Sequence, residues 1–171
     1  MGLPGSPEAA AGQSRSIQYR ELDGYKYQLA RPYSLTIPGS FGLQNVRKDR
    51  TIAHPKENPM IALTRLQGSP GSCLLEISEG YAWDGPSGPT IDTKNFMRGA
   101  LVHDALYQLM RERLVPVEYK DDADRVLQAI CREDGMSRFR AWYVYQSVKR
   151  FAGFAISARD EEPIEVLRMA P

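Results

Sequence analysis

The stretch GALVHDALYQL, residues 99–109, places a histidine and an aspartate side by side within an otherwise apolar run. Apolar residues recur here at intervals of three and four, which predicts an amphipathic helix. When the helix is turned by about 100° per residue, His103 falls on the apolar stripe and points towards the core, whereas Asp104 lies at the border of that stripe. We therefore expect the two ionisable side chains to have different roles.

Three helices are expected after Gly88, because the hydrophobic period changes there from two to about 3.6 residues. Polar caps, a proline in a first turn and a glycine after a last turn are the usual signals of helix boundaries. The first helix is expected from Asp92 or Thr93 to Arg113, the second from Pro116 to Gly135, and the third from Ser137 to Ser157.

The half of the chain before these helices shows the pattern of short strands. The segments IQYREL, YKYQLA, YSLTI, MIALTRL, CLLEI and GYAW are rich in strand-forming residues and are separated by Gly, Pro and Asn clusters. The polar stretch at residues 38–59 is expected to be one long loop. The sequence therefore predicts an α+β fold, with an N-terminal antiparallel β-sheet followed by three helices.

A chain of 171 residues can bury one sizeable core. Residues 1–16 contain mostly Gly, Ala, Pro and Ser and are expected to form a flexible arm. We expect a single α+β domain at residues 17–158 and a C-terminal tail at residues 159–171.

Composition argues against several classes of function. Lys and Arg total 22 against 21 for Asp and Glu, so nucleic acid is not expected as a partner. No apolar run approaches the roughly 18 residues of a transmembrane segment, and no signal peptide is recognisable. The two cysteines match neither a disulfide framework nor a zinc site, which favours a reduced, intracellular setting.

The second helix offers a partner for His103. Its apolar stripe contains Tyr119, Ala123, Val126, Leu127, Ile130 and Cys131, and Asp124 lies at the edge of that stripe. Two antiparallel helices joined by a short turn would bring Asp124 against His103. This pairing would fix the imidazole and leave its far nitrogen as a base. A core histidine satisfied by an aspartate would give the same sequence pattern.

The loop GYAWDGPSGP, residues 80–89, precedes the first helix and is a candidate cation site. Its glycines and prolines leave backbone carbonyls unused by strand pairing, and calcium prefers such oxygens together with carboxylates. The candidate metal residues are Asp84, Gly85, Gly88 and Asp104. A zinc site at Asp84, His103 and Asp104 is weaker because it lacks a second histidine. A sharp chain reversal between sheet and helix would also explain the glycines.

Two resemblances accompany these residues. The segments GYAWDGPS, VHDALY and DDAD resemble a family of uncharacterised small proteins of bacteriophages, prophages and their hosts, over residues 25–153. This resemblance implies phage structural proteins as partners and a location in the host cytoplasm or the virion. It implies no defined activity.

The order of the loop, the His-Asp-x-x-Tyr helix and the returning aspartate also resembles the site of phospholipase A2, particularly its bacterial forms. The resemblance implies that His103 activates water, Asp104 binds calcium, Asp124 orients the histidine and Tyr107 supports the network by a hydrogen bond. The cysteines that brace these helices in that family are missing, since Ala100 and Ala105 lie beside the pair.

Two functions from different classes follow. The first is a metal-assisted hydrolase of an ester or amide of the bacterial envelope that uses the His103 and Asp124 dyad. The second is a non-catalytic virion component of tail or capsid, in which the same network is structural.

The third predicted helix carries aromatic residues over too wide an arc for one stripe. These are Phe139, Trp142, Tyr143, Tyr145, Phe151 and Phe154. Core packing is the first expectation for them, and an interface is the alternative. The basic residues of this helix are expected to face water, or to contact a membrane head group or an acidic partner.

Overall fold

The computed structural model describes residues 16–22, 27–41, 51–53, 60–85 and 94–157, and side chains are described for all of these except 51–53 and 151–157. Several predictions concern residues outside these ranges. They are the flexible arm up to residue 15, the tail at 159–171, the helix cap at Asp92 or Thr93, and Gly88 as a loop ligand.

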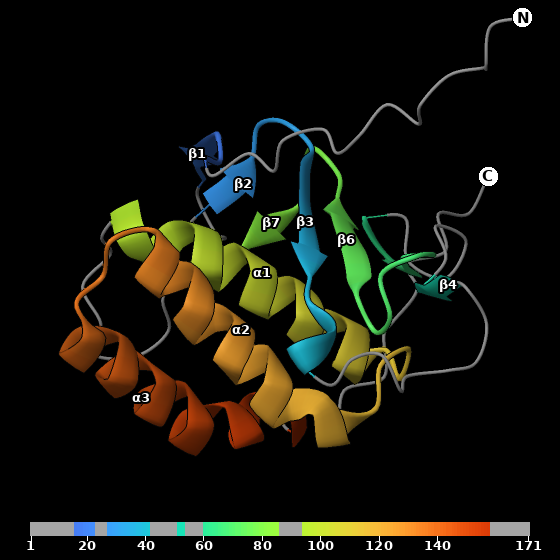
Figure 1. Cartoon of the computed structure of the whole chain (residues 1–171). Coiled ribbons are helices and arrows are strands. Elements are labelled where there is room, and N and C mark those ends of the chain that lie inside the picture. Colours follow the sequence, from blue (N-terminus) through green and yellow to red (C-terminus); the bar gives the residue numbers. More distant parts are fainter. Residues whose placement is uncertain (1–15, 23–26, 42–50, 54–59, 86–93, 158–171) are drawn as a thin grey trace, which may run out of the picture.

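Two antiparallel sheets contain the described strands (Figure 1). The smaller sheet has the order β1 (Tyr19–Glu21), β2 (Tyr27–Leu29) and β7 (Ala82–Trp83), and the larger has the order β3 (Tyr33–Ile37), β6 (Cys73–Ile77), β5 (Ile61–Arg65) and β4 (Thr51–Ala53). Every neighbouring pair is antiparallel. Three helices follow, which confirms the predicted α+β fold.

The larger sheet buries one face because its strands alternate apolar and polar residues. Leu75 on β6 is opposite Leu35 on β3 and opposite Leu63 on β5. All three leucines are buried, and they form the centre of the inward face. The two cysteines, Cys73 and Cys131, are also buried, and both are free thiols.

The prediction of one continuous loop at residues 38–59 is wrong at two places. A 3₁₀ turn, η1 (Gly39–Phe41), follows β3 directly. Strand β4 then pairs with β5, with Thr51 opposite Thr64 and Ala53 opposite Leu63. Strand β4 forms because β5 offers its edge as a pairing partner. Its three residues are too few to show an alternating pattern in the sequence.

The helices begin and end close to the predicted boundaries. They are α1 (Lys94–Arg111), α2 (Lys120–Glu133), which follows the 3₁₀ turn η3 (Val117–Tyr119), and α3 (Arg138–Ser157). Gly135 has φ +88° after α2, and the Oγ of Ser137 accepts a hydrogen bond from the backbone N–H of Arg140 at 3.3 Å. These features confirm the glycine and serine boundary signals. Among the described residues, no helix is both long enough and apolar enough to cross a membrane.

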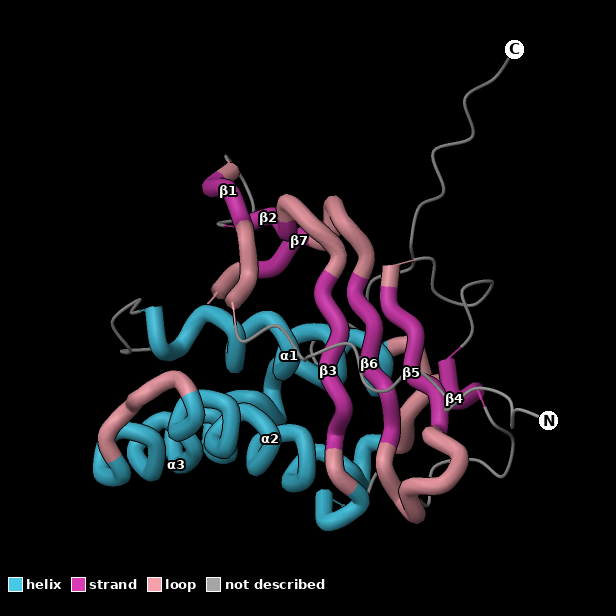
Figure 2. Tube along the Cα trace, turned by 45° about the horizontal axis from the view of Figure 1, so that its top comes forward, coloured by secondary structure: helices cyan, strands magenta, loops and turns pink. Residues whose placement is uncertain are grey.

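Helix α1 lies in the middle of the molecule. The larger sheet covers one side of it, α2 lies along another, and α3 packs on α2 (Figures 1 and 2). One cluster of buried residues joins both sheets to α1 and α2. The centre of α1 therefore contacts neighbours on nearly every side, and its side chains are held in fixed positions.

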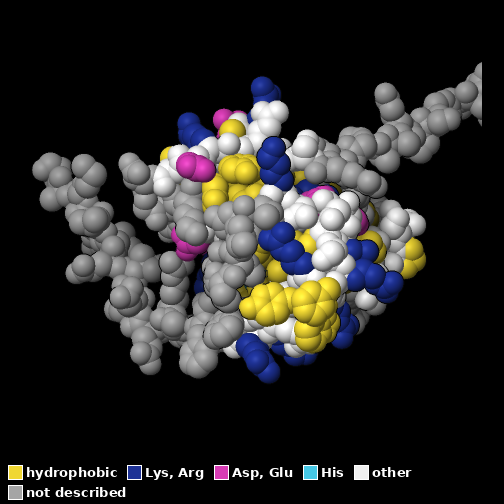
Figure 3. Space-filling model, turned by 90° about the vertical axis from the view of Figure 1, so that its left-hand side faces the viewer, with side chains coloured by type: hydrophobic (Ala, Val, Ile, Leu, Met, Phe, Trp, Pro, Cys, Tyr) yellow, Lys and Arg dark blue, Asp and Glu magenta, His cyan; other side chains and the backbone are white. Residues whose placement is uncertain are grey.

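The aromatic residues of the third helix were expected to pack in the core, and this prediction is wrong for three of them. Phe139, Trp142 and Tyr143 are exposed, whereas Ala141 and Val144 provide the buried contacts of α3. Figure 3 shows the side of the molecule on which α3 begins, where hydrophobic side chains gather with Lys and Arg side chains close by. The small residues of this helix pack inward because they allow close approach to α2.

Candidate functional site

The structure brings Asp124 of α2 against His103 of α1, as the helical pattern predicted. The Nε2 atom of His103 lies 2.9 Å from Oδ1 of Asp124. Asp124 has no exposed surface, and the histidine side chain is 9% exposed. The pair therefore lies at the α1–α2 contact with only a small part of the imidazole open to water.

Two further donors complete the surroundings of Asp124. The hydroxyl of Tyr107 donates to the same Oδ1 atom at 2.7 Å, and Nζ of Lys120 donates to Oδ2 at 3.0 Å. Burial alone would raise the pKa of Asp124, but the bonds from His103, Tyr107 and Lys120 outweigh burial and lower the pKa below its ordinary value. Asp124 is therefore an ionised acceptor.

The charge of Asp124 determines where the imidazole carries its proton. An ionised carboxylate accepts but does not donate, so Nε2 of His103 must be the donor. In the neutral ring the lone pair then lies on Nδ1. The tyrosine ring of Tyr107 packs beside the imidazole, with centroids 4.0 Å apart. Both contacts hold the ring in one orientation.

Asp104 lies on the other side of the ring. Its Oδ1 atom is 3.7 Å from Nδ1 of His103, which is too long for a direct hydrogen bond. The Asp104 side chain is 29% exposed, so this side of the imidazole is the one closer to water. Burial opposes protonation of His103, but the two neighbouring carboxylates outweigh it and raise the pKa of His103.

The close contact between α1 and α2 depends on a small residue one turn before His103. A Cβ atom placed on Gly99 would lie 2.8 Å from Cδ1 of Leu127 and 3.0 Å from Sγ of Cys131. Both distances are shorter than ordinary contacts, so even a methyl group at Gly99 would force the Leu127 and Cys131 side chains of α2 to shift. Gly99 thus allows His103 to reach Asp124.

Lys120 is the member of the network that the sequence reasoning missed. It is the first residue of α2 and precedes Asp124 by four positions. The (i, i+4) spacing of opposite charges on a helix was the available signal. The side chain of Lys120 is mostly buried, so it neutralises Asp124 away from solvent.

The candidate cation loop is described only in part. Asp84 follows β7 directly and is exposed. Burial raises the pKa of Asp104, and the nearby negative charge of Asp84 adds to the rise, so the two carboxylates lie in the same region. Gly85 has φ +72°, and a Cβ atom there would lie 2.5 Å from the ring of Tyr27. A chain reversal against Tyr27 is sufficient to explain this glycine.

Metal binding stays a prediction. Among the described residues, no group of three or more His, Cys, Asp and Glu side chains is arranged to hold a metal ion. The two carboxylates of Asp84 and Asp104 match the oxygen ligands that calcium prefers, and further oxygens would have to come from backbone carbonyls or water.

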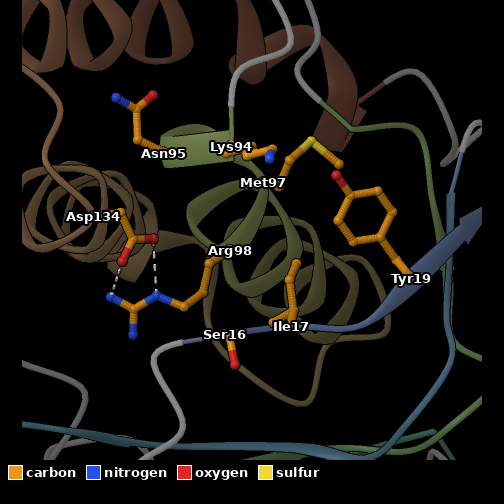
Figure 4. A pocket seen from close by; sticks show the side chains of 8 residues that line it. All are labelled: Ser16, Ile17, Tyr19, Lys94, Asn95, Met97, Arg98 and Asp134. Carbon is orange, nitrogen blue, oxygen red and sulfur yellow. Dashed lines mark hydrogen bonds and ion pairs between the residues drawn. The ribbon is translucent and has the colours of Figure 1, made fainter.

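A separate hollow of about 680 Å³ lies between the start of β1 and the first turns of α1. Figure 4 shows the side chains that line it. They are Ser16, Ile17, Tyr19, Lys94, Asn95, Met97, Arg98 and Asp134. None of these residues belongs to the His103 network, so this hollow is no extension of the candidate site.

Arg98 borders that hollow and forms a second buried polar cluster. Its guanidinium contacts Asp134 at 2.8 and 3.0 Å and Glu133 at 2.8 Å. The hydroxyl of Tyr33 on β3 accepts a longer bond at 3.4 Å. Arg98 is only 2% exposed. The helical pattern did not predict this cluster, although an arginine within the buried stretch of a helix needs such partners.

Comparison with protein-family models, with curated proteins and with solved structures finds no match. The likenesses to phage proteins and to phospholipase A2 remain predictions based on the quoted segments.

Proposed function

We propose that the chain is a hydrolase of ester or amide bonds in which His103 is the general base. One observation carries this proposal. The Nε2 side of the imidazole is bound to the buried carboxylate of Asp124, whereas the Nδ1 side faces the partly exposed Asp104. A histidine that is fixed at one nitrogen and free to accept a proton at the other has the arrangement of a general base.

In the proposed reaction, a water molecule beside Nδ1 gives a proton to His103 while its oxygen attacks the carbonyl carbon of the substrate. Asp124 stabilises the imidazolium that forms, because its negative charge lies 2.9 Å from Nε2. The carbonyl oxygen takes up negative charge. When the carbon–oxygen or carbon–nitrogen bond breaks, the proton on Nδ1 passes to the leaving group and His103 returns to its neutral form.

Calcium is the cofactor that the donor set fits best. Asp84 and Asp104 would hold it, and a bound calcium ion would supply positive charge for the carbonyl oxygen. Tyr107 and Lys120 act on Asp124 rather than on the substrate, since both contact its carboxylate. They are positioning residues in this proposal.

The resemblances support the substrate class. A phage-like protein with a phospholipase-like order of site residues fits an ester or amide of the bacterial envelope, in lipid or peptidoglycan. Purified protein should release acid from phospholipid vesicles or fragments from peptidoglycan. We expect His103→Gln to abolish turnover and Asp104→Asn or a calcium chelator to suppress it.

The test needs a variant that keeps the fold. Asp124→Asn retains the shape and can still accept a bond from Tyr107, so we expect a folded protein with strongly reduced turnover. Glu118→Gln, at an exposed position outside the network, is the matched control and should keep full activity. Turnover that survives His103→Gln, or that ignores chelation, contradicts the mechanism.

A non-catalytic virion component is the second candidate. The observation in its favour is that Asp124 is fully buried and bonded to three side chains of its own chain, as in a purely structural network. Under this function, Asp124→Ala costs about 3 to 5 kcal/mol of stability. Mass spectrometry of purified particles separates the candidates, since a structural component must be present in them.

A further inference from the structure

Helix α3 has apolar side chains on its solvent side as well as on its buried side. Phe139 is 76% exposed, Trp142 50% and Tyr143 43%. Their spacing of three and four positions places them on one face of the helix, which we call the α3 aromatic face. Ala141 and Val144 lie on the opposite face and pack against α1 and α2. The aromatic side chains are therefore not needed for the core.

The charge on this helix has one sign. Between Arg138 and Ser157 the sequence contains four basic residues and no acidic residue. Arg138 and Arg150 are exposed, and Lys149 forms an ion pair with Asp121 of α2 at 3.1 Å. Figure 3 shows Lys and Arg side chains close to the exposed hydrophobic cluster. A ligand for this face must therefore present negative charge beside an apolar layer.

We propose that the α3 aromatic face binds the surface of an anionic lipid bilayer. Trp, Tyr and Phe side chains prefer the boundary between head groups and acyl chains, and Arg side chains pair with lipid phosphates. The three exposed rings would enter that boundary, and Arg138 and Arg150 would contact the negative head groups. This surface function is separate from the proposed hydrolysis and does not depend on it.

Two observations favour a bilayer over a protein partner. The face is the outer side of one helix, and it contributes no residue to the hollow beside Arg98 or to the hollow beside Tyr33. A standard protein interface uses about 20 to 30 residues on each side, far more than three rings and two arginines. A second copy of the chain is disfavoured because a symmetric contact would place the basic residues of both copies together.

The test uses full-length protein with vesicles of phosphatidylcholine alone or mixed with phosphatidylglycerol. We expect co-sedimentation with the mixed vesicles, with weaker binding at high salt, and a blue shift in tryptophan emission. The triple variant Phe139→Ser, Trp142→Ser, Tyr143→Ser should bind at least about tenfold more weakly, since the buried apolar area is lost. Arg138→Gln with Arg150→Gln should weaken binding to the mixed vesicles and reduce its dependence on salt.

Trp142→Phe is the matched control, because it keeps an aromatic ring on the face but removes its tryptophan signal. It should bind the mixed vesicles nearly as well as the unaltered chain and show no blue shift. Circular dichroism checks that every variant is folded. Failure to bind anionic vesicles at low salt, or equal binding by the triple variant, overturns the proposal. A dimer in sedimentation that the triple variant dissociates also overturns it and assigns the face to a second copy.

Discussion

At the scale of single residues, Asp124 is the least exposed charged side chain among the described residues. Its carboxylate has no exposed surface, yet it is ionised because His103, Tyr107 and Lys120 all donate to it. Removing a buried carboxylate leaves its donors without an acceptor, which costs more than the loss of an exposed pair. The same bonds that fix the candidate base therefore also stabilise the fold.

The coupled titration of this network predicts how stability depends on pH. The pKa of Asp124 is below its ordinary value of 3.8, so its contribution is present above that value and is lost as the pH falls through the folded-state pKa. The pKa of His103 is above 6.5, so its contribution is full below 6.5 and is lost as the pH rises through the folded-state pKa.

Urea unfolding across a pH series should therefore show a maximum in the free energy of unfolding on the acidic side of neutrality. His103→Gln should remove most of the decline above pH 6.5. Burial raises the pKa of Asp104, so ionisation of its carboxyl group also lowers the free energy of unfolding as the pH rises. Asp104→Asn removes this contribution and separates it from that of His103. A decline above pH 6.5 that is unchanged in His103→Gln would assign it to another group.

Two glycines with positive φ, Gly68 and Gly85, provide a matched pair for measuring how tightly the candidate cation loop packs against Tyr27. Gly68 has φ +82° with nothing within 4 Å of an added Cβ, whereas an added Cβ at Gly85 would lie 2.5 Å from the ring of Tyr27. We expect Gly68→Ala to cost roughly 1 to 2 kcal/mol through the backbone alone. Gly85→Ala should cost roughly 1 to 3 kcal/mol more, because the ring must move. Equal losses in urea unfolding would show that the loop shifts freely away from Tyr27.

The sequence predicted the central contact of the site but not all its members. Helical periodicity placed His103 on the apolar stripe of one helix and Asp124 at the edge of the stripe of the next, and the short turn between the helices made an antiparallel contact the expected arrangement. Lys120 and Arg98 were missed, since burial of a long basic side chain depends on which neighbours surround it. Asp84 and Asp104 lie in the same region, but ligand geometry depends on backbone positions that residue types do not specify.

At the scale of elements, the Arg98 cluster joins three parts of the chain. Arg98 lies in the second turn of α1, Glu133 and Asp134 end α2, and Tyr33 begins β3. Burial raises the pKa of Tyr33 and prevents its ionisation, so its hydroxyl stays a neutral partner. The cluster fixes the end of α2 to α1 at a second point, five residues before His103 on α1, and this limits how the two helices can rotate.

Arg98→Met should therefore destabilise the chain strongly. The side chain of Asp134 is only 12% exposed, and without Arg98 its charge has no strong partner, so we expect a loss of about 3 to 5 kcal/mol. Glu133→Gln is the control, because Glu133 is 52% exposed and its pair with Arg98 contributes only about 0 to 1 kcal/mol. Similar small losses in both variants would mean that the cluster adds little to the α1–α2 contact.

Most elements were predictable, and the failures have physical reasons. Strands β3, β5 and β6 alternate clearly because one face of their sheet is buried. Helix α1 was expected to have one apolar stripe, but Leu101, Leu106 and Leu109 are also fully buried, since the sheet covers a second side. Helix α3 shows the opposite case: its large aromatic residues face outward, and periodicity alone does not tell which side of a helix meets the core.

At the scale of the whole molecule, two buried clusters overlap at the α1–α2 pair. The larger joins both sheets to these helices, and the smaller joins α3 to them through Phe96, Leu127, Cys131, Met136, Ala141 and Val144. The candidate site lies within the one helix pair that both clusters share. A site built on such rigid elements is held more precisely than a site on loops.

This overlap predicts that the two sheets and the helices unfold together. Trp83 belongs to the small sheet, and its ring lies 5.7 Å from that of Tyr27, while both residues belong to the larger cluster. In Trp142→Phe, which alters an exposed position, fluorescence reports on Trp83 alone and far-UV circular dichroism reports mainly on the helices. The buried residues of the sheets and those of α1 and α2 pack against one another in a single cluster, so neither part keeps its core when the other unfolds. The two urea transitions should have the same midpoint and steepness, and a Trp83 transition at lower urea would show that the small sheet separates from α1 first.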